Sequence, residues 1–103
     1  MLDLARVEGF EWDTGNAGKN DRHSVNQQEA EQVFFNQPLL LIEDPKHSAS
    51  EPRYHALGKT FEERLLHIAF TLRAEGKSIR VISARPMHRK ERMVYGQTPE
   101  IRP

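Results

Sequence analysis

The sequence predicts an α+β domain in which two N-terminal helices and one C-terminal helix cover one side of a four-stranded antiparallel sheet. Apolar residues recur with a helical period in the first third of the chain and in short strand-like runs after residue 38. The links between these later runs are short, which favours antiparallel neighbours, because a parallel crossover needs about a dozen residues. At 103 residues the chain fits one domain, 1–103, with flexible ends expected over 1–8 and 96–103.

The N-terminal third carries two helix signals. Asp13 precedes TGNAGKNDRH, where its carboxylate can cap a short helix over residues 14–23. Asn26 lies three residues before Glu29, which is the spacing of a capping box, and an apolar stripe follows it. This second signal predicts an amphipathic helix over residues 27–35.

Four strand-like runs and a final helix follow. The runs cover residues 38–45, 53–60, 63–73 and 77–83. Gly76, in the last connector, can adopt the positive φ that a tight turn requires. Ser83 can then cap a helix that begins near Pro86, which a first helical turn tolerates, and that ends by Gly96.

The formal net charge is zero, but the two halves of the chain are oppositely charged. Residues 1–51 carry four Lys/Arg against ten Asp/Glu, and residues 52–103 carry eleven against five. The density of positive charge is highest over residues 77–93, which contain Lys77, Arg80, Arg85, Arg89, Lys90 and Arg92 with only Glu91 as a counter-charge. This asymmetry predicts a basic face for a polyanion or for an acidic protein partner.

Composition excludes several other classes. The absence of cysteine rules out disulfides and thiolate zinc sites and suits a reducing compartment. The N-terminus lacks a signal-peptide pattern and no apolar run approaches a membrane span, so we expect a cytoplasmic protein without a membrane partner. No glycine-rich phosphate loop or G-x-S-x-G sequence is present, and no helix-turn-helix pattern suggests direct DNA binding.

Arginines are the first candidates for a binding site. Arg80 alternates with apolar neighbours in its strand, so it should lie on the open face of the sheet. Arg85, Arg89 and Arg92 are spaced i, i+4 and i+7 and would form one stripe on the final helix, near Tyr95. A guanidinium binds phosphate through two parallel hydrogen bonds, so the cluster suits a phosphate, although a solvated basic surface would give the same pattern.

Histidines are the second candidates. The five histidines lack the spacing of a metal motif, so we expect neither a metal site nor another cofactor. His55 and His67 lie in neighbouring predicted strands, where either could transfer a proton near neutral pH. A half-buried strand histidine without a catalytic role is the alternative interpretation.

Taken together, these segments resemble the BrnT family, the toxins of type II toxin–antitoxin pairs. The resemblance covers about residues 9–95 and runs through FEWD, KNDRHSV, QEAEQVFFNQPLLL with DPKHS, RYHALGKT, RLLHIAFT and IRVISARPMHRKERMVY. Its most specific part is I-R-x-I-S-A-R followed by a basic helix. The resemblance implies a RelE-like ribonuclease fold and RNA cleavage that inhibits translation. It also implies a BrnA-type antitoxin that masks the toxin and represses the operon, with two toxins and two antitoxins in the complex.

The resemblance further implies metal-independent chemistry, in which an RNA 2′-hydroxyl attacks its own phosphodiester while arginines stabilise the developing charge. The residues that match the family pattern are Arg64, Arg80, Arg85, Arg89 and Tyr95. Together with neighbouring residues they give two candidate sets. The catalytic candidates are Arg64, Arg80, Arg85, His55 and His67, and the substrate-binding candidates are Arg89, Lys90, Arg92 and Tyr95. Members often carry a histidine at the position of Phe70 and an acidic residue at that of Leu72, and a glycine is usual at the position of Ser24.

Two hypotheses from different classes follow. The first is an endoribonuclease toxin with His55 or His67 as the proton-transfer group. The second is a non-catalytic module on the same fold that binds RNA or protein, and it is motivated by the missing histidine at Phe70.

Overall fold

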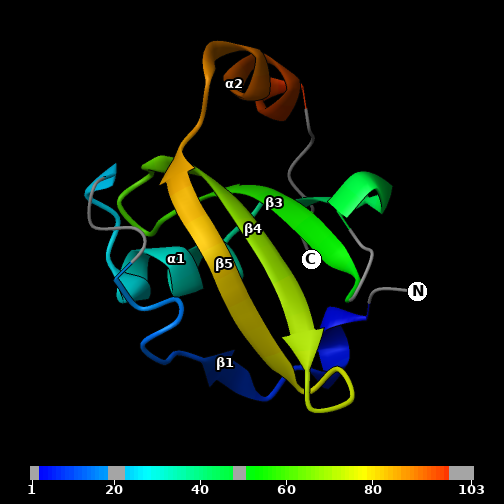
Figure 1. Ribbon diagram of the computed structural model, residues 1–103. Helices are drawn as coiled ribbons and strands as arrows, with labels where there is room; N and C mark the ends of the chain where they lie inside the picture. The colour runs from blue at the N-terminus through cyan, green and yellow to red at the C-terminus, as the bar shows by residue number, and fades with distance from the viewer. Residues whose placement is uncertain (1–2, 19–22, 48–50, 98–103) are drawn as a thin grey trace.

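A computed structural model describes residues 3–18, 23–47 and 51–97, and shows a five-stranded mixed sheet with two α-helices (Figure 1). The α+β class is confirmed. The elements are η1 (Leu4–Arg6), β1 (Gly9–Glu11), α1 (Gln27–Val33), β2 (Leu40–Asp44), η3 (Pro45–His47), β3 (Arg53–Lys59), β4 (Leu65–Arg73), β5 (Ser78–Pro86) and α2 (Arg89–Gly96). The strands lie in the order β1-β5-β4-β3-β2. Neither α-helix in these ranges has the length and apolar character needed to span a bilayer.

Strands β2 to β5 form the antiparallel sheet that the sequence predicts, and β1 is a fifth strand that the prediction omitted. It pairs in parallel with β5, with Gly9 beside Ser78 and Glu11 beside Arg80. A strand of three residues is too short to show a period of two, so only its pairing with β5 identifies it.

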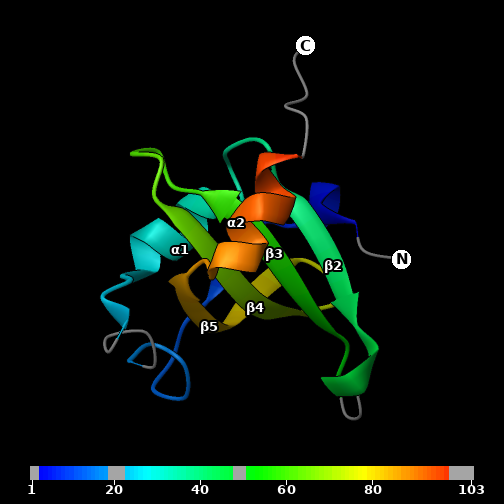
Figure 2. The ribbon, with the colours of Figure 1, turned by 90° about the horizontal axis from the view of Figure 1, so that it is seen from above.

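The two α-helices cover opposite faces of the sheet, so the prediction of helices on one side is wrong. Successive residues of a strand point to opposite faces. In β3, Ala56 belongs to the large core under α1, whereas Leu57 packs in a smaller cluster with Met87 and Tyr95 of the α2 region. Figure 2 shows α2 lying across the strands when the molecule is seen from above.

Helix α1 begins where the sequence predicts and ends two residues earlier. Asn26 accepts a hydrogen bond from the Glu29 backbone N–H at 2.8 Å, and the Glu29 carboxylate accepts one from the Asn26 N–H at 3.1 Å, so the capping box is confirmed. The helix packs closely on β3, because a Cβ added at Gly58 would lie 2.6 Å from Cγ1 of Val33. Glycine at this position therefore sets the distance between helix and sheet.

The predicted helix over 14–23 does not form in its described part, because residues 14–18 are turns and 19–22 lie outside the described residues. The Asp13 carboxylate still accepts a hydrogen bond from the Gly15 N–H at 2.8 Å. The Asn16 amide continues this turn by donating to the Glu11 and Val81 carbonyls. Ser24 has a φ of 57°, a left-handed conformation in which a glycine is unstrained.

The junction between β5 and α2 lies later than predicted. Ser83 is a residue of β5, which continues to Pro86, so Ser83 does not cap the final helix. His88 occupies the N-cap position instead. At the other end of the chain, Leu4 and Val7 pack against the core. Residues 1–2 and 98–103 lie outside the described residues, and the flexible ends stay a prediction.

Candidate active site

A cavity of about 460 Å³ lies between the sheet and α2. Four strands and the helix contribute its lining residues, which are Ile42, His55, Leu57, His67, Arg85, Lys90, Glu91 and Val94. These side chains come from the sheet face opposite α1. The cavity combines apolar walls with two histidines, two cations and one carboxylate, the composition expected of a site for a polar ligand.

Strand register explains why the two histidines meet. His67 of β4 lies between Leu57 of β3 and Arg85 of β5, and His55 lies one diagonal step away on the same face. Their rings stack with centroids 4.8 Å apart and an interplanar angle of 25°. Phe70 is fully buried against α1, on the face opposite His67, as strand alternation predicts.

His55 is fixed by a carboxylate of the neighbouring strand. Its Nε2 lies 2.7 Å from Oδ2 of Asp44, a distance at which the ring N–H donates to the carboxylate. The Nδ1 atoms of both His55 and His67 are buried without a hydrogen-bond partner among the residues that the structure describes. Each of these ring nitrogens is a polar group that a ligand or a water molecule can satisfy.

His67 is neutral at pH 7. Burial lowers its pKa from 6.5 to about 4, and the positive charge of Arg85 contributes in the same direction. A neutral imidazole has an unprotonated ring nitrogen, so at neutral pH His67 is free to act as a proton acceptor, with the low basicity that a pKa of about 4 implies.

Arg85 forms a bidentate ion pair inside the cavity. Its Nη1 and Nη2 donate to Oε1 and Oε2 of Glu91 at 2.8 and 2.9 Å. Oε1 of Glu91 also accepts the backbone N–H of His88 at 2.8 Å. Burial alone would raise the pKa of Glu91, but the hydrogen bonds from Arg85 and from His88 lower it to about 2. Glu91 therefore stays ionised and joins the end of β5 to the start of α2.

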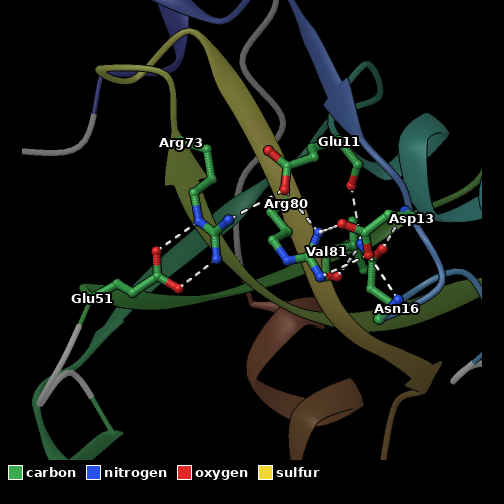
Figure 3. Close-up of polar contacts among 8 residues, drawn as sticks. Glu11, Asp13, Asn16, Glu51, Arg73, Arg80 and Val81 are labelled. Atoms are coloured by element: carbon green, nitrogen blue, oxygen red, sulfur yellow. Dashed lines mark hydrogen bonds and ion pairs between the residues drawn. The ribbon is translucent and has the colours of Figure 1, made fainter.

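Arg80 lies five residues before Arg85, about 16 Å along an extended strand, yet on the same face of β5, because a register shift opposite Ala69 and Phe70 interrupts the alternation between them. Its guanidinium donates to Glu11 and twice to Asp13, at 2.8 to 3.0 Å, as Figure 3 shows. Hydrogen bonds from Arg80 and then from the Gly15 N–H lower the pKa of Asp13. Arg80 thus ties the segment after β1 to β5 and is not among the residues that line the cavity.

Arg64 and Tyr95 also lie outside the cavity. Arg64 donates to the carboxylate of Glu29 and to the carbonyl of Ser24, at 2.7 to 3.1 Å, and so holds the start of α1 beside β4. Tyr95 is buried, and its hydroxyl donates to the Pro38 carbonyl at 2.6 Å.

The cations of α2 are exposed. Lys90 lines the cavity, Arg89 is exposed in the first turn, and Arg92 donates to the Met87 carbonyl at 2.7 Å. The predicted single helical stripe is wrong, because Arg85 belongs to β5. Of the predicted site residues, the fold brings together His55, His67, Arg85 and Lys90.

Sequence reasoning missed two groups of the site: Glu91, which lines the cavity, and Asp44, which holds His55. Glu91 carries a detectable signal, since it stands three residues after the N-cap position His88, where a carboxylate accepts the cap N–H. Asp44 has no such local signal, because its contact with His55 depends on the pairing of β2 with β3. Among the described residues, no group of three or more His, Asp or Glu side chains is placed to hold a metal ion.

Comparison with known proteins identifies the family. The sequence profile of BrnT, the ribonuclease toxin of type II toxin–antitoxin systems, matches residues 12–91. This segment contains α1, β2 to β5 and the residues of the cavity from Ile42 to Glu91. No curated protein matches the chain. Because the family profile matches well over half of the sequence, the chain belongs to the BrnT family of ribonuclease toxins.

Proposed function

We propose that this protein is a cytoplasmic toxin that cleaves RNA without a metal ion, in the cavity between the sheet and α2. Membership of a ribonuclease toxin family supports RNA as the substrate. The observation that carries the proposal is the position of a neutral His67 next to Arg85 in one cavity. A base beside a phosphate-binding cation is what cleavage by an RNA 2′-hydroxyl requires.

In the proposed reaction, a ring nitrogen of His67 takes the proton of the 2′-hydroxyl. The 2′-oxygen then forms a bond to the adjacent phosphorus, and the bond from phosphorus to the 5′-oxygen breaks. The products are a 2′,3′-cyclic phosphate and a 5′-hydroxyl, whose oxygen receives the proton that His67 took, while His55 stacks on the His67 ring and orients it. Asp44 holds the His55 ring in place.

Cations supply the electrostatic part of the mechanism. Arg85 and Lys90 lie at the cavity and stabilise the extra negative charge of the pentacoordinate phosphorus. Arg89 and Arg92 lie outside it on α2 and bind the flanking phosphates. We assign Arg64, Arg80 and Tyr95, which the sequence suggested as site residues, to holding the fold around the cavity.

A cleavage assay in EDTA tests the proposal. Purified protein should cut RNA and leave 2′,3′-cyclic phosphate ends, with and without added ribosomes compared in parallel. His67→Ala and Arg85→Ala should each lower the rate about 100-fold or more. Lys77→Ala is the matched control, because Lys77 is an exposed cation in the turn before β5, and it should cut normally.

The alternative is a binding module on the same fold, which is favoured by the placement of Phe70 in the core rather than in the cavity. Tight RNA binding without cleavage in either arm of the assay would support this module and contradict the enzyme. In cells, expression of the chain alone should arrest growth, and Arg85→Ala at equal abundance should relieve the arrest.

A type II system implies an antitoxin partner. We propose a BrnA-type antitoxin that binds this chain as two toxins with two antitoxins and represses the operon, so that DNA contacts come from the antitoxin. Co-expression with the antitoxin should restore growth, and light scattering of the purified complex measures the stoichiometry.

A further inference from the structure

The guanidinium of Arg85 has two edges that can each bind an anion through two hydrogen bonds. Of its five N–H groups, three are used by the described residues. Nη1 and Nη2 donate to Glu91, and the second N–H of Nη1 donates to the Pro86 carbonyl at 3.1 Å. Glu91 therefore occupies the first edge of the guanidinium, which is formed by Nη1 and Nη2. The second edge, formed by Nε–H and the remaining Nη2–H, has no hydrogen-bond acceptor among the described residues.

We propose that Glu91 is a positioning residue, which fixes the guanidinium of Arg85 so that its Nε/Nη2 side receives the scissile phosphate through two parallel hydrogen bonds. This inference rests on the proposed ribonuclease function and names the atoms by which Arg85 acts. A phosphate bound in this way leaves the ion pair with Glu91 intact. The carboxylate and the phosphate then share one planar cation, each on its own edge.

Glu91 is suited to this role because it is itself held by the backbone. Its Oε1 accepts the His88 N–H at the start of α2, which restrains the carboxylate relative to the helix. The helix is anchored on the sheet by buried Met87 and by the hydrogen bond from Tyr95 to the Pro38 carbonyl. The side chains of Arg85 and Glu91 are each 24% exposed, so both are largely enclosed. The orientation of the guanidinium is thus set by a series of packed contacts.

The same ion pair could instead hinder the substrate, if the phosphate needed the edge that Glu91 occupies. The two cases predict opposite results when the carboxylate is neutralised. A positioning residue gives a slower enzyme with little change in KM, whereas a competitor gives a lower KM and an undiminished kcat.

Glu91→Gln separates these cases and preserves the helix. Glutamine at this position still accepts the cap N–H, so α2 should remain folded at the assay temperature, as circular dichroism would show, although loss of the ion pair with Arg85 lowers the melting temperature. Its amide NH₂ faces a guanidinium N–H, so one of the two hydrogen bonds to Arg85 is lost. We expect kcat to fall about tenfold or more, as a loosened catalytic group does, with KM within about twofold. Glu62→Gln, at an exposed loop position, is the matched control and should retain both constants.

A double-mutant cycle tests whether Glu91 acts through Arg85. Arg85→Lys keeps the charge but lacks a planar edge, so it should lower kcat, and Glu91→Gln should then add no further loss. An independent loss in the Arg85→Lys background would overturn the inference, as would a lower KM or an unchanged kcat in Glu91→Gln alone.

A binding measurement separates this inference from the proposed function. The Nε–H resonance of Arg85 can be followed by NMR during titration with inorganic phosphate. A saturable shift in the wild type that weakens in Glu91→Gln supports the inference, even if no RNA is cut. An Arg85 Nε–H that does not respond to phosphate in the wild type overturns it, whatever the cleavage assay shows.

Discussion

At the scale of single residues, His67 and Glu91 show how the cavity sets protonation. Burial and Arg85 keep His67 neutral with a pKa of about 4, while the hydrogen bonds from Arg85 and the His88 N–H keep Glu91 charged with a pKa of about 2. One arginine thus disfavours a proton on both neighbours. At neutral pH the site holds a base without its proton next to a paired cation.

The low pKa of His67 predicts a stability that depends on pH. In the unfolded chain the histidine titrates near 6.5, and in the folded protein near 4. Between these pH values His67 is protonated in the unfolded chain but not in the folded protein. The free energy of unfolding is therefore highest above pH 6.5 and falls as the pH drops towards 4. His67→Gln should flatten this slope, measured by urea unfolding at a series of pH values.

Glu91 provides an internal reference for that experiment. Its contribution to stability is present above pH 4.5 and is lost as the pH falls towards 2. Glu91 therefore changes stability at lower pH values than His67 does. His67→Gln should leave the loss of stability below pH 4.5 in place. An unchanged slope between pH 6.5 and 4.5 would contradict the neutral state of His67.

Arg64→Ala should affect stability rather than chemistry. The Arg64 side chain joins β4 to Glu29 and to the Ser24 carbonyl, and it is 34% exposed, so we expect a loss of about 1–2 kcal/mol in the free energy of unfolding. The kcat of the folded fraction should stay within about twofold of the wild type. A loss of tenfold or more at full folding would return Arg64 to the catalytic residues.

Individual site residues were predictable to the extent that they follow local patterns. His55 and His67 were expected from two neighbouring strands, and the cavity contains both. Arg85 was expected at the junction between the strand and the final helix, and it lies near the end of β5. Asp44 was not predictable, because its role depends on which strand lies beside β3 and in which register. Local patterns in the sequence do not reveal that register.

At the scale of elements, periodicity predicted which helices and strands form better than it predicted how they are arranged around the sheet. Helix α1 and strands β2 to β5 were expected close to their observed bounds. The face covered by α2 was not, because it depends on the packing of Met87 and Tyr95 against Leu57 of β3, a contact between residues far apart in the sequence.

The contact between α1 and β3 gives a prediction at this scale. Gly58→Ala places a Cβ against Cγ1 of Val33 and should cost about 1–3 kcal/mol of stability, measured by urea unfolding. Val33→Ala removes the clashing methyl group, so the cost of Gly58→Ala should shrink in that background. Gly96→Ala is the control, since an added Cβ meets nothing within 4 Å there. Equal costs in both backgrounds would show that the clash is absent.

At the scale of the whole molecule, the opposite charges of the two halves are partly neutralised inside the fold. Glu11 and Asp13 bind Arg80, and Glu51 binds Arg73, as Figure 3 shows. Arg73 and Arg80 are consequently paired with carboxylates, and the basic face covers a smaller part of the surface than the charge pattern of the sequence suggested. Its remaining cations gather at the cavity and along α2.

The two apolar clusters described above differ in size, so α2 and the cavity beneath it should open more readily than the sheet and α1. The large cluster joins α1 to the sheet, whereas α2 is held by a small one, formed by Leu57, Met87 and Tyr95 with Leu40 and Leu65 at its margin. A helix attached in this way can detach by subglobal opening while the sheet persists. Amides of α2 should exchange with deuterium faster than those of β4, and by a route that does not require global unfolding.

On heating, RNA cleavage should then disappear several degrees below the midpoint for loss of the sheet, as followed by circular dichroism. A toxin built in this way can be switched off without being unfolded, because removing one short helix dismantles the cavity and leaves the rest of the protein intact.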